Sequence, residues 1–115
     1  MYRSSYAEVI QDTGTEARQR ERQAFAESIR LLRAAEAKGR ASGEAIEAIY
    51  FVRRLWSMLL EDLGSAENSL PPALRAHLIS IGIWIMREAE QIRLEQSDNF
   101  KGIADVSAIV EAGLA

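Results

Sequence analysis

The sequence contains no cysteine, a single histidine, two prolines and only two lysines. The absence of cysteine excludes disulfides and thiolate chemistry, and the lone His77 excludes metal sites built on pairs of histidines. No glycine-rich phosphate loop follows a predicted strand. Glu88 and Glu90 point to different sides of a helix and do not form a carboxylate pair. We therefore expect a protein that is not an enzyme and that needs no metal or cofactor.

Long apolar runs are also missing. The most apolar stretch, residues 78–86, is far too short to cross a bilayer. The first five residues do not carry the apolar stretch and small-residue cleavage site of a secretion signal. We expect a cytoplasmic protein without membrane contact.

The length of 115 residues suits a single domain, residues 1–115, and is enough to bury a core. Lys and Arg total 14 and Asp and Glu total 17, which gives a formal net charge of -3. A mildly acidic chain is a poor electrostatic match for nucleic acid. Nearly all the basic residues are arginines, which fork carboxylates and stack on rings, so the composition favours contacts with other proteins.

Glycines and one Pro-Pro pair divide the chain into four pieces, at about residues 14–38, 42–63, 71–96 and 97–114. Each piece carries apolar residues at steps of three and four, which predicts an amphipathic helix. Thr13 and Glu16 have the spacing of a capping box, and Gly39 suits a helix stop. We predict an all-α fold, a small bundle of three or four main helices, with residues 2–10 as either a short additional helix or an extended arm.

The two middle pieces are apolar nearly all round, which is more apolar surface than a lone bundle of this size can enclose. We infer that the excess is where another chain docks, either a partner protein or a second copy. Residues 77–86 alone would also suit a buried strand, but their flanks favour a helix. Gly82 indicates either close approach of another helix or a hinge. The predicted core stripe of this helix is Leu74, Leu78, Ile81, Ile85, Ala89 and Ile92.

The candidate partner-binding residues are the aromatic residues and arginines of these middle pieces: Phe51, Arg53, Arg54, Trp56 and Trp84. Aromatic and Arg side chains are enriched at interface hot spots. The alternative is structural: the arginines would lie over the core and pair with carboxylates of neighbouring helices, and Trp84 would belong to the core.

Several sequence blocks are similar to those of one bacterial family. The strongest is Leu-Pro at residues 70–71 followed by Leu-Arg-Ala-His-Leu-Ile-Ser-Ile-Gly-Ile-Trp at residues 74–84. Phe-Val-Arg-Arg-Leu-Trp at residues 51–56 is another. Further blocks lie at residues 5–9, 20–24, 59–63, 67–68, 97–100 and 112–114. Together they cover nearly the whole chain, which resembles the flagellar biosynthesis regulator FlaF family.

The resemblance implies a protein of flagellar assembly that is needed for flagellin production or export. It also implies flagellin as a partner and joint action with the flagellin translation regulator FlbT, and it assigns no catalytic residue. Two functions follow as expectations. The first is a flagellin chaperone or adaptor that binds by helix-in-groove docking. The second is a post-transcriptional regulator of flagellin mRNA translation, acting directly or with FlbT.

Overall fold

The computed structural model of the chain describes the backbone of residues 6–113 and the side chains of residues 16–113. The described residues form four helices and contain no strand. The helices are α1 (Tyr6–Lys38), α2 (Gly43–Leu63), α3 (Pro72–Arg93) and α4 (Phe100–Ala112). The predicted all-α fold is confirmed, and the stretch that would also suit a buried strand lies inside α3.

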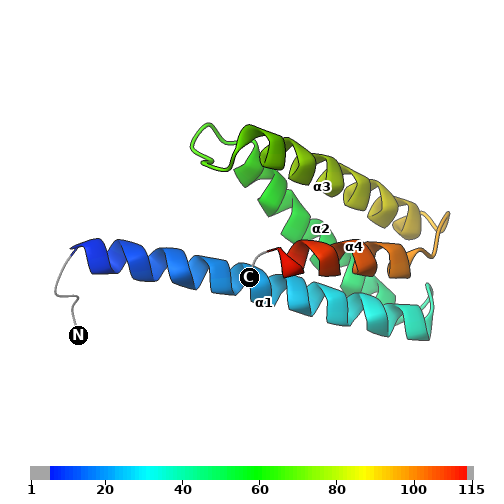
Figure 1. The fold of residues 1–115 in the computed structure, drawn as a ribbon. Helices are drawn as coiled ribbons and strands as arrows, with labels where there is room; N and C mark the ends of the chain where they lie inside the picture. The colour runs from blue at the N-terminus through cyan, green and yellow to red at the C-terminus, as the bar shows by residue number, and fades with distance from the viewer. Residues whose placement is uncertain (1–5, 114–115) are drawn as a thin grey trace.

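The helices form an open bundle (Figure 1). α1 packs against α2 and α4, α2 also packs against α3, and α3 touches α4 only slightly. Within the described residues α1 and α3 do not contact each other. The Cα radius of gyration is 16.1 Å, compared with about 13 Å for a compact chain of this length. The bundle is therefore elongated, and it is open between α1 and α3.

α1 extends further towards the N-terminus than the sequence predicts. It begins at Tyr6, so Thr13 and Gly14 lie within the helix and the predicted capping box does not mark its start. A glycine inside a helix costs only about 1 kcal/mol relative to alanine, which the rest of a long helix can offset. Residues 6–10 therefore belong to α1, and they form neither a separate helix nor an arm. The remainder of that predicted segment, residues 2–5, lies outside the described residues.

Side-chain caps fix the starts of α2 and α4. The Ser42 hydroxyl accepts a hydrogen bond from the Ala45 amide at 3.1 Å, and the Asn99 side-chain oxygen accepts one from the Gly102 amide at 3.0 Å. Such caps satisfy amides that have no partner within the first turn of a helix. Asn99, at the end of the short polar linker between α3 and α4, therefore fixes the start of α4.

The ends of α1 and α3 use left-handed residues. Gly39 follows α1 with a φ of 95°, as expected of a helix stop. α3 ends before the predicted residue 96, because Glu95 has a φ of 62°. The Glu95 amide donates to the Ile92 carbonyl, and the Gln96 amide donates to the Gln91 carbonyl. This is the Schellman arrangement, which closes a helix even though the local sequence would allow it to continue.

The core joins all four helices. Trp56 in α2 is 1% exposed, and the Phe25 ring of α1 stands edge-on to it with the two centroids 5.7 Å apart. Edge-to-face packing of this kind adds about 0.5–1.5 kcal/mol to the burial of the rings. The other large core residues include Leu32, Val52, Ile85, Phe100 and Ile103.

Gly82 lets α3 approach α2 closely. A Cβ atom at this position would lie 2.7 Å from Leu60 Cδ2 and 2.8 Å from Trp56 Cε3. Both distances are well below van der Waals contact, so a side chain here would press on the buried indole ring. The close-approach hypothesis for Gly82 is confirmed.

We expect Gly82→Ala to lower the free energy of unfolding by about 1 kcal/mol. Overpacking against a rigid buried ring costs about 1–3 kcal/mol, and alanine returns up to about 1 kcal/mol of helix propensity. The matched control is Gly43→Ala, because a Cβ at Gly43 would meet nothing within 4 Å. Urea unfolding followed by circular dichroism measures both variants. Equal stability of the two would contradict the close approach.

Candidate functional site

The apolar stripe of α3 is covered along only half of its length. Ile85, Ala89 and Ile92 are buried as predicted, whereas Leu78 is half-buried and Leu74 is 45% exposed. The prediction of Leu74 as a core residue is wrong because α1 does not reach this half of α3. The first half of the stripe therefore faces an opening in the bundle.

This half of α3 is one wall of an apolar groove, which we call the α1–α3 groove. α2 contributes Leu59 and Leu63, α4 contributes Ile109 and Val110, and α1 contributes Phe25. The groove has a volume of about 540 Å³, which lies in the range of ligand-binding clefts. Figure 1 shows α3 diverging from α1 and α4 at this end of the molecule. Ile109 is 72% exposed, so the groove offers apolar surface to another molecule.

Four polar residues also line the groove: Arg18, Glu21, Asp62 and His77. Burial raises the pKa of Glu21, and the nearby Asp62 carboxylate raises it further. The two carboxylates repel each other and make this part of the groove acidic, while Arg18 adds one positive charge to the same lining. A cationic side chain of a bound segment would relieve that repulsion.

The outer side of α2 carries a second exposed apolar surface. Ile46, Tyr50 and Met58 are 71%, 63% and 65% exposed. Together with Arg54 they follow one another at steps of four residues, so they lie on one side of the helix. We call this row the α2 face: Ile46, Tyr50, Arg54 and Met58.

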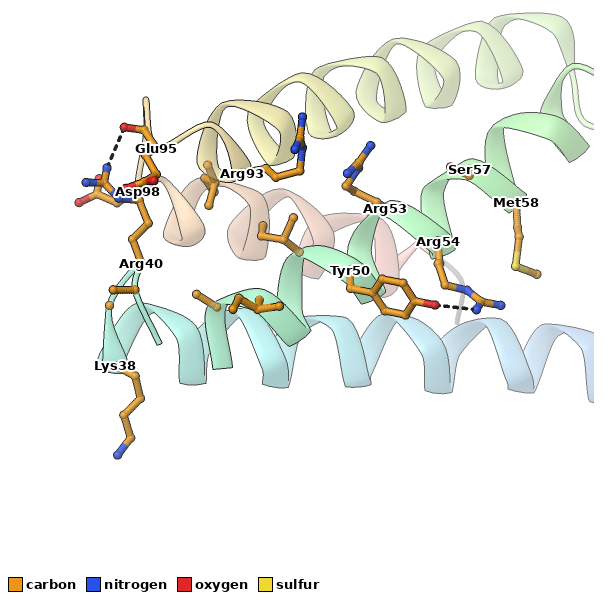
Figure 2. A pocket seen from close by; sticks show the side chains of 16 residues that line it. Lys38, Arg40, Tyr50, Arg53, Arg54, Ser57, Met58, Arg93, Glu95 and Asp98 are labelled. Carbon is orange, nitrogen blue, oxygen red and sulfur yellow. Dashed lines mark hydrogen bonds between the residues drawn. The ribbon is translucent and has the colours of Figure 1, made fainter. Parts of the chain in front are cut away.

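The α2 face borders a wide hollow of about 1230 Å³. The α1–α2 loop and the α3–α4 loop close one end of it, where the Arg40 guanidinium donates to the Glu95 backbone carbonyl at 3.3 Å (Figure 2). Arg53 from α2 and Arg93 from α3 line the side next to α3. Arginines therefore lie beside the exposed apolar row on its α3 side and at its loop end.

The two arginines predicted as binding residues differ in their surroundings. Arg53 Nη2 lies 3.7 Å from Glu90 Oε1 of α3, which is the structural alternative stated for it. Arg54 has no carboxylate partner among the described residues. Its guanidinium donates to the Tyr50 hydroxyl at 3.2 Å and lies 5.7 Å from the centroid of that ring (Figure 2). Arg54 is therefore the member of the pair whose charge is available to a partner.

The three aromatic candidates are not brought together. Trp56 is buried in the core against Gly82 and also lines the α1–α3 groove, so it is a wall residue of that groove and not an exposed side chain. Its indole N–H has no hydrogen-bond partner among the described residues. Phe51 is half-buried against the core. Trp84 is exposed on α3 outside both the groove and the α2 face, so the core alternative for it is wrong.

Several exposed apolar residues of the two surfaces were not among the binding residues predicted from the sequence. A signal for Ile46, Tyr50 and Met58 was present, because α2 is apolar nearly all round. Leu74 gave no such signal, because helical steps place it with buried residues of the same helix. Only the missing contact between α1 and α3 exposes Leu74, and that contact is not a local property of the sequence.

The described residues hold no group of histidine, aspartate and glutamate side chains suited to a metal ion. None of the described helices combines the length and the apolar character that crossing a bilayer requires. The fold and its two surfaces define a small all-helical protein with exposed apolar faces.

The chain matches the family described as flagellar protein FlaF over residues 2–114, nearly its whole length. It belongs to this family and is a flagellar protein, as the resemblance implied. No curated protein and no solved structure matches the chain.

We expect Glu21→Gln to stabilise the fold at pH 7. Because burial and Asp62 raise the pKa of Glu21 above its usual 4.5, the folded protein holds this proton more tightly than the unfolded chain. The ionised carboxylate therefore destabilises the fold above the raised pKa, and this effect disappears as the pH falls to the unfolded pKa. The gain at neutral pH should be at most about 0.5 kcal/mol, since the side chain is partly exposed.

Urea unfolding at pH 7 and near pH 4 measures this difference. Glu61→Gln, an exposed change on α2, serves as the control for removing one negative charge. A gain from Glu21→Gln that is as large near pH 4 as at pH 7 would refute the explanation.

Proposed function

We propose that this FlaF family protein binds flagellin as a chaperone or adaptor for flagellin production or export, and that it acts by binding alone. A helical segment of flagellin would lie in the α1–α3 groove. The observation that carries this proposal is the uncovered first half of the α3 stripe, which leaves an apolar groove in an otherwise packed bundle. Membership of the FlaF family supports flagellin as the partner.

The groove suits an amphipathic helix. Its apolar side chains recur at helical steps, with Leu59 and Leu63 on α2 and Leu74, Leu78 and Ile81 on α3. Helices pack by interleaving rows of this kind, and docking of a helix into an apolar groove is a recurrent mode of peptide recognition. A bound helix would lie between α1 and α3, where no described element packs.

The charges of the groove favour one orientation of the bound helix. Glu21 and Asp62 repel each other, so a Lys or Arg of the flagellin segment placed between them would gain attraction and remove repulsion. The apolar residues would then supply most of the affinity, and the carboxylates would fix the direction.

Covering an apolar helical segment is the physical task of such a chaperone. An unassembled filament subunit exposes apolar helical surface, and exposed patches of this kind drive self-association. A groove that takes up the segment reversibly would keep the subunit available for export.

We expect Leu74→Glu and Ile109→Glu each to weaken flagellin binding by at least about tenfold, because a charge would be buried against an apolar helix. Both side chains are exposed in the free protein, so the fold should be retained. Isothermal titration calorimetry with purified flagellin measures the affinity, and circular dichroism checks the fold.

The matched control is Ile83→Glu, a change at an exposed isoleucine of α3 outside both surfaces, which should bind as the wild type does. Trp84→Ala in the same series tests the remaining exposed aromatic candidate. No binding of wild-type protein at high micromolar concentration would end the flagellin proposal. Normal binding by Leu74→Glu and Ile109→Glu would instead remove the groove as its site.

The second candidate function is post-transcriptional regulation of flagellin mRNA, directly or with FlbT. The arginines around the α2 face are the observation that favours it. The net charge of -3 speaks against direct RNA binding, because RNA affinity depends on neutralising phosphates. Glu95 and Asp98 in the same hollow add to this.

We expect no retention of flagellin leader RNA by the purified protein in a filter-binding assay at low salt. Direct recognition would instead show strong retention that falls steeply as salt is added. Retention of that kind would favour the second candidate over a function by protein binding alone.

A further inference from the structure

The α2 face differs from the groove in its charge, and we propose that it is a second docking surface, which takes an acidic amphipathic helix of another protein. The α2 face and the groove share no residue. The loops that close the hollow lie at the opposite end of α3 from the groove (Figure 1). A protein with both surfaces would hold two partners at once, so this inference goes beyond flagellin binding and does not require it.

Positive charge gathers at this surface in a chain whose net charge is -3. The hollow is lined by four arginines, Arg40, Arg53, Arg54 and Arg93. Lys38 also lines it, but Figure 2 shows its side chain extending away from α2. The lining carboxylates are Glu95 and Asp98, and both lie at the loop end. The part of the hollow next to the exposed apolar row is therefore cationic.

The two arginines on the α3 side of the hollow share a single carboxylate, that of Glu90. Arg93 Nη2 donates to Glu90 Oε2 at 2.6 Å, and Arg53 Nη2 lies 3.7 Å from Glu90 Oε1. One negative charge cannot neutralise two positive charges, so this group keeps a net positive charge.

The other two arginines contact neutral acceptors. Arg40 donates to the backbone carbonyl of Glu95, and Arg54 donates to the hydroxyl of Tyr50. Neither is within ion-pair distance of a carboxylate in the part of the chain that the structure describes. Their charge remains available to an acidic partner.

Arg54 is also held in position. Its contact with the Tyr50 hydroxyl and ring limits the freedom of a side chain that otherwise loses much entropy on binding. It lies in one row with Ile46, Tyr50 and Met58. A helix that covers the apolar members of this row would bring its own flanking side chains to Arg54. Glutamate or aspartate there would pair with the guanidinium through two hydrogen bonds.

A protein helix suits this surface better than nucleic acid. Single-stranded RNA binds through successive aromatic platforms, and the row offers one aromatic ring, Tyr50, which already contacts Arg54. Ile46 and Met58 give apolar contact without a flat surface for a base. Arginine with exposed aliphatic and aromatic side chains is the composition of protein interfaces.

The test uses two designed helical peptides of about 20 residues, long enough to form a helix on docking. One carries leucines at helical steps with flanking glutamates, and the other has lysine at each glutamate position. Fluorescence anisotropy should show that the full-length protein binds the acidic peptide at least about tenfold more tightly than the basic one. Arg54→Glu and Tyr50→Glu should each lower the affinity for the acidic peptide by about tenfold.

The controls separate charge from site. Arg87→Glu makes the same change in net charge as Arg54→Glu, but at an exposed position of α3 outside both surfaces. This variant should bind the acidic peptide as the wild type does. Ile109→Glu, in the groove, should also leave acidic-peptide binding unchanged.

Four results would overturn the proposal. The first is equal binding of the two peptides, and the second is acidic-peptide binding that is unchanged by Arg54→Glu and Tyr50→Glu. The third is a solution dimer, measured by light scattering, that Tyr50→Glu dissociates, because the surface would then serve a second copy. The fourth is single-stranded RNA that binds through Arg54 and is not displaced by the acidic peptide, because the surface would then serve nucleic acid and the peptide would not bind there.

Discussion

At the crossing of α2 and α3 the Trp56 indole occupies the space where a side chain of residue 82 would otherwise project. The second half of α3 can therefore lie close to α2, and Ile85, Ala89 and Ile92 become part of the core. Beyond the crossing α3 diverges from α1, and no contact forms between them in the described part of the chain. The same close approach that completes the core thus leaves the other half of α3 uncovered.

Packing rather than surface charge holds this arrangement. Arg33 of α1 and Asp105 of α4 form an ion pair at 2.8 Å, and Lys101 also pairs with Asp105 at 2.7 Å. Hydrogen bonds from Lys101 and Arg33 hold the pKa of Asp105 below its usual value. These side chains are exposed to solvent, and pairs in that setting add little to stability. The buried edge-to-face pair of Phe25 and Trp56, by contrast, joins α1 to α2 within the core.

Local rules of the sequence predicted most of the secondary structure. Helical periodicity placed all four helices, and the conformation of Gly39 and the cap at Asn99 follow directly from residue type. Two helix boundaries were not predicted: the start of α1 at Tyr6 and the end of α3 before Glu95. The first depends on how many poor helix formers a long helix can accommodate. The second depends on the direction in which the chain must turn after α3. Neither is visible in a short window of sequence.

The candidate surfaces were predicted only in part. The excess of apolar residues in α2 and α3 indicated that some would remain exposed, and Ile46, Tyr50 and Met58 do. Which residues these are depends on the helix neighbours. Trp56 and Trp84 both lie in apolar stretches, yet one faces the crossing with α3 and the other faces outwards. Periodicity alone does not distinguish the two residues, because it does not reveal which neighbour covers which side of a helix.

The open bundle also affects how long the chain would survive in a cell. The first half of α3 leaves Leu74 exposed, and no contact forms between α3 and α1 in the described residues. Regions with few buried apolar contacts open first during local unfolding. Proteases act on such transiently opened segments. An occupant of the α1–α3 groove would bind the closed form and suppress the opening by mass action. The lifetime of the protein, and hence its abundance, would then follow the supply of that occupant.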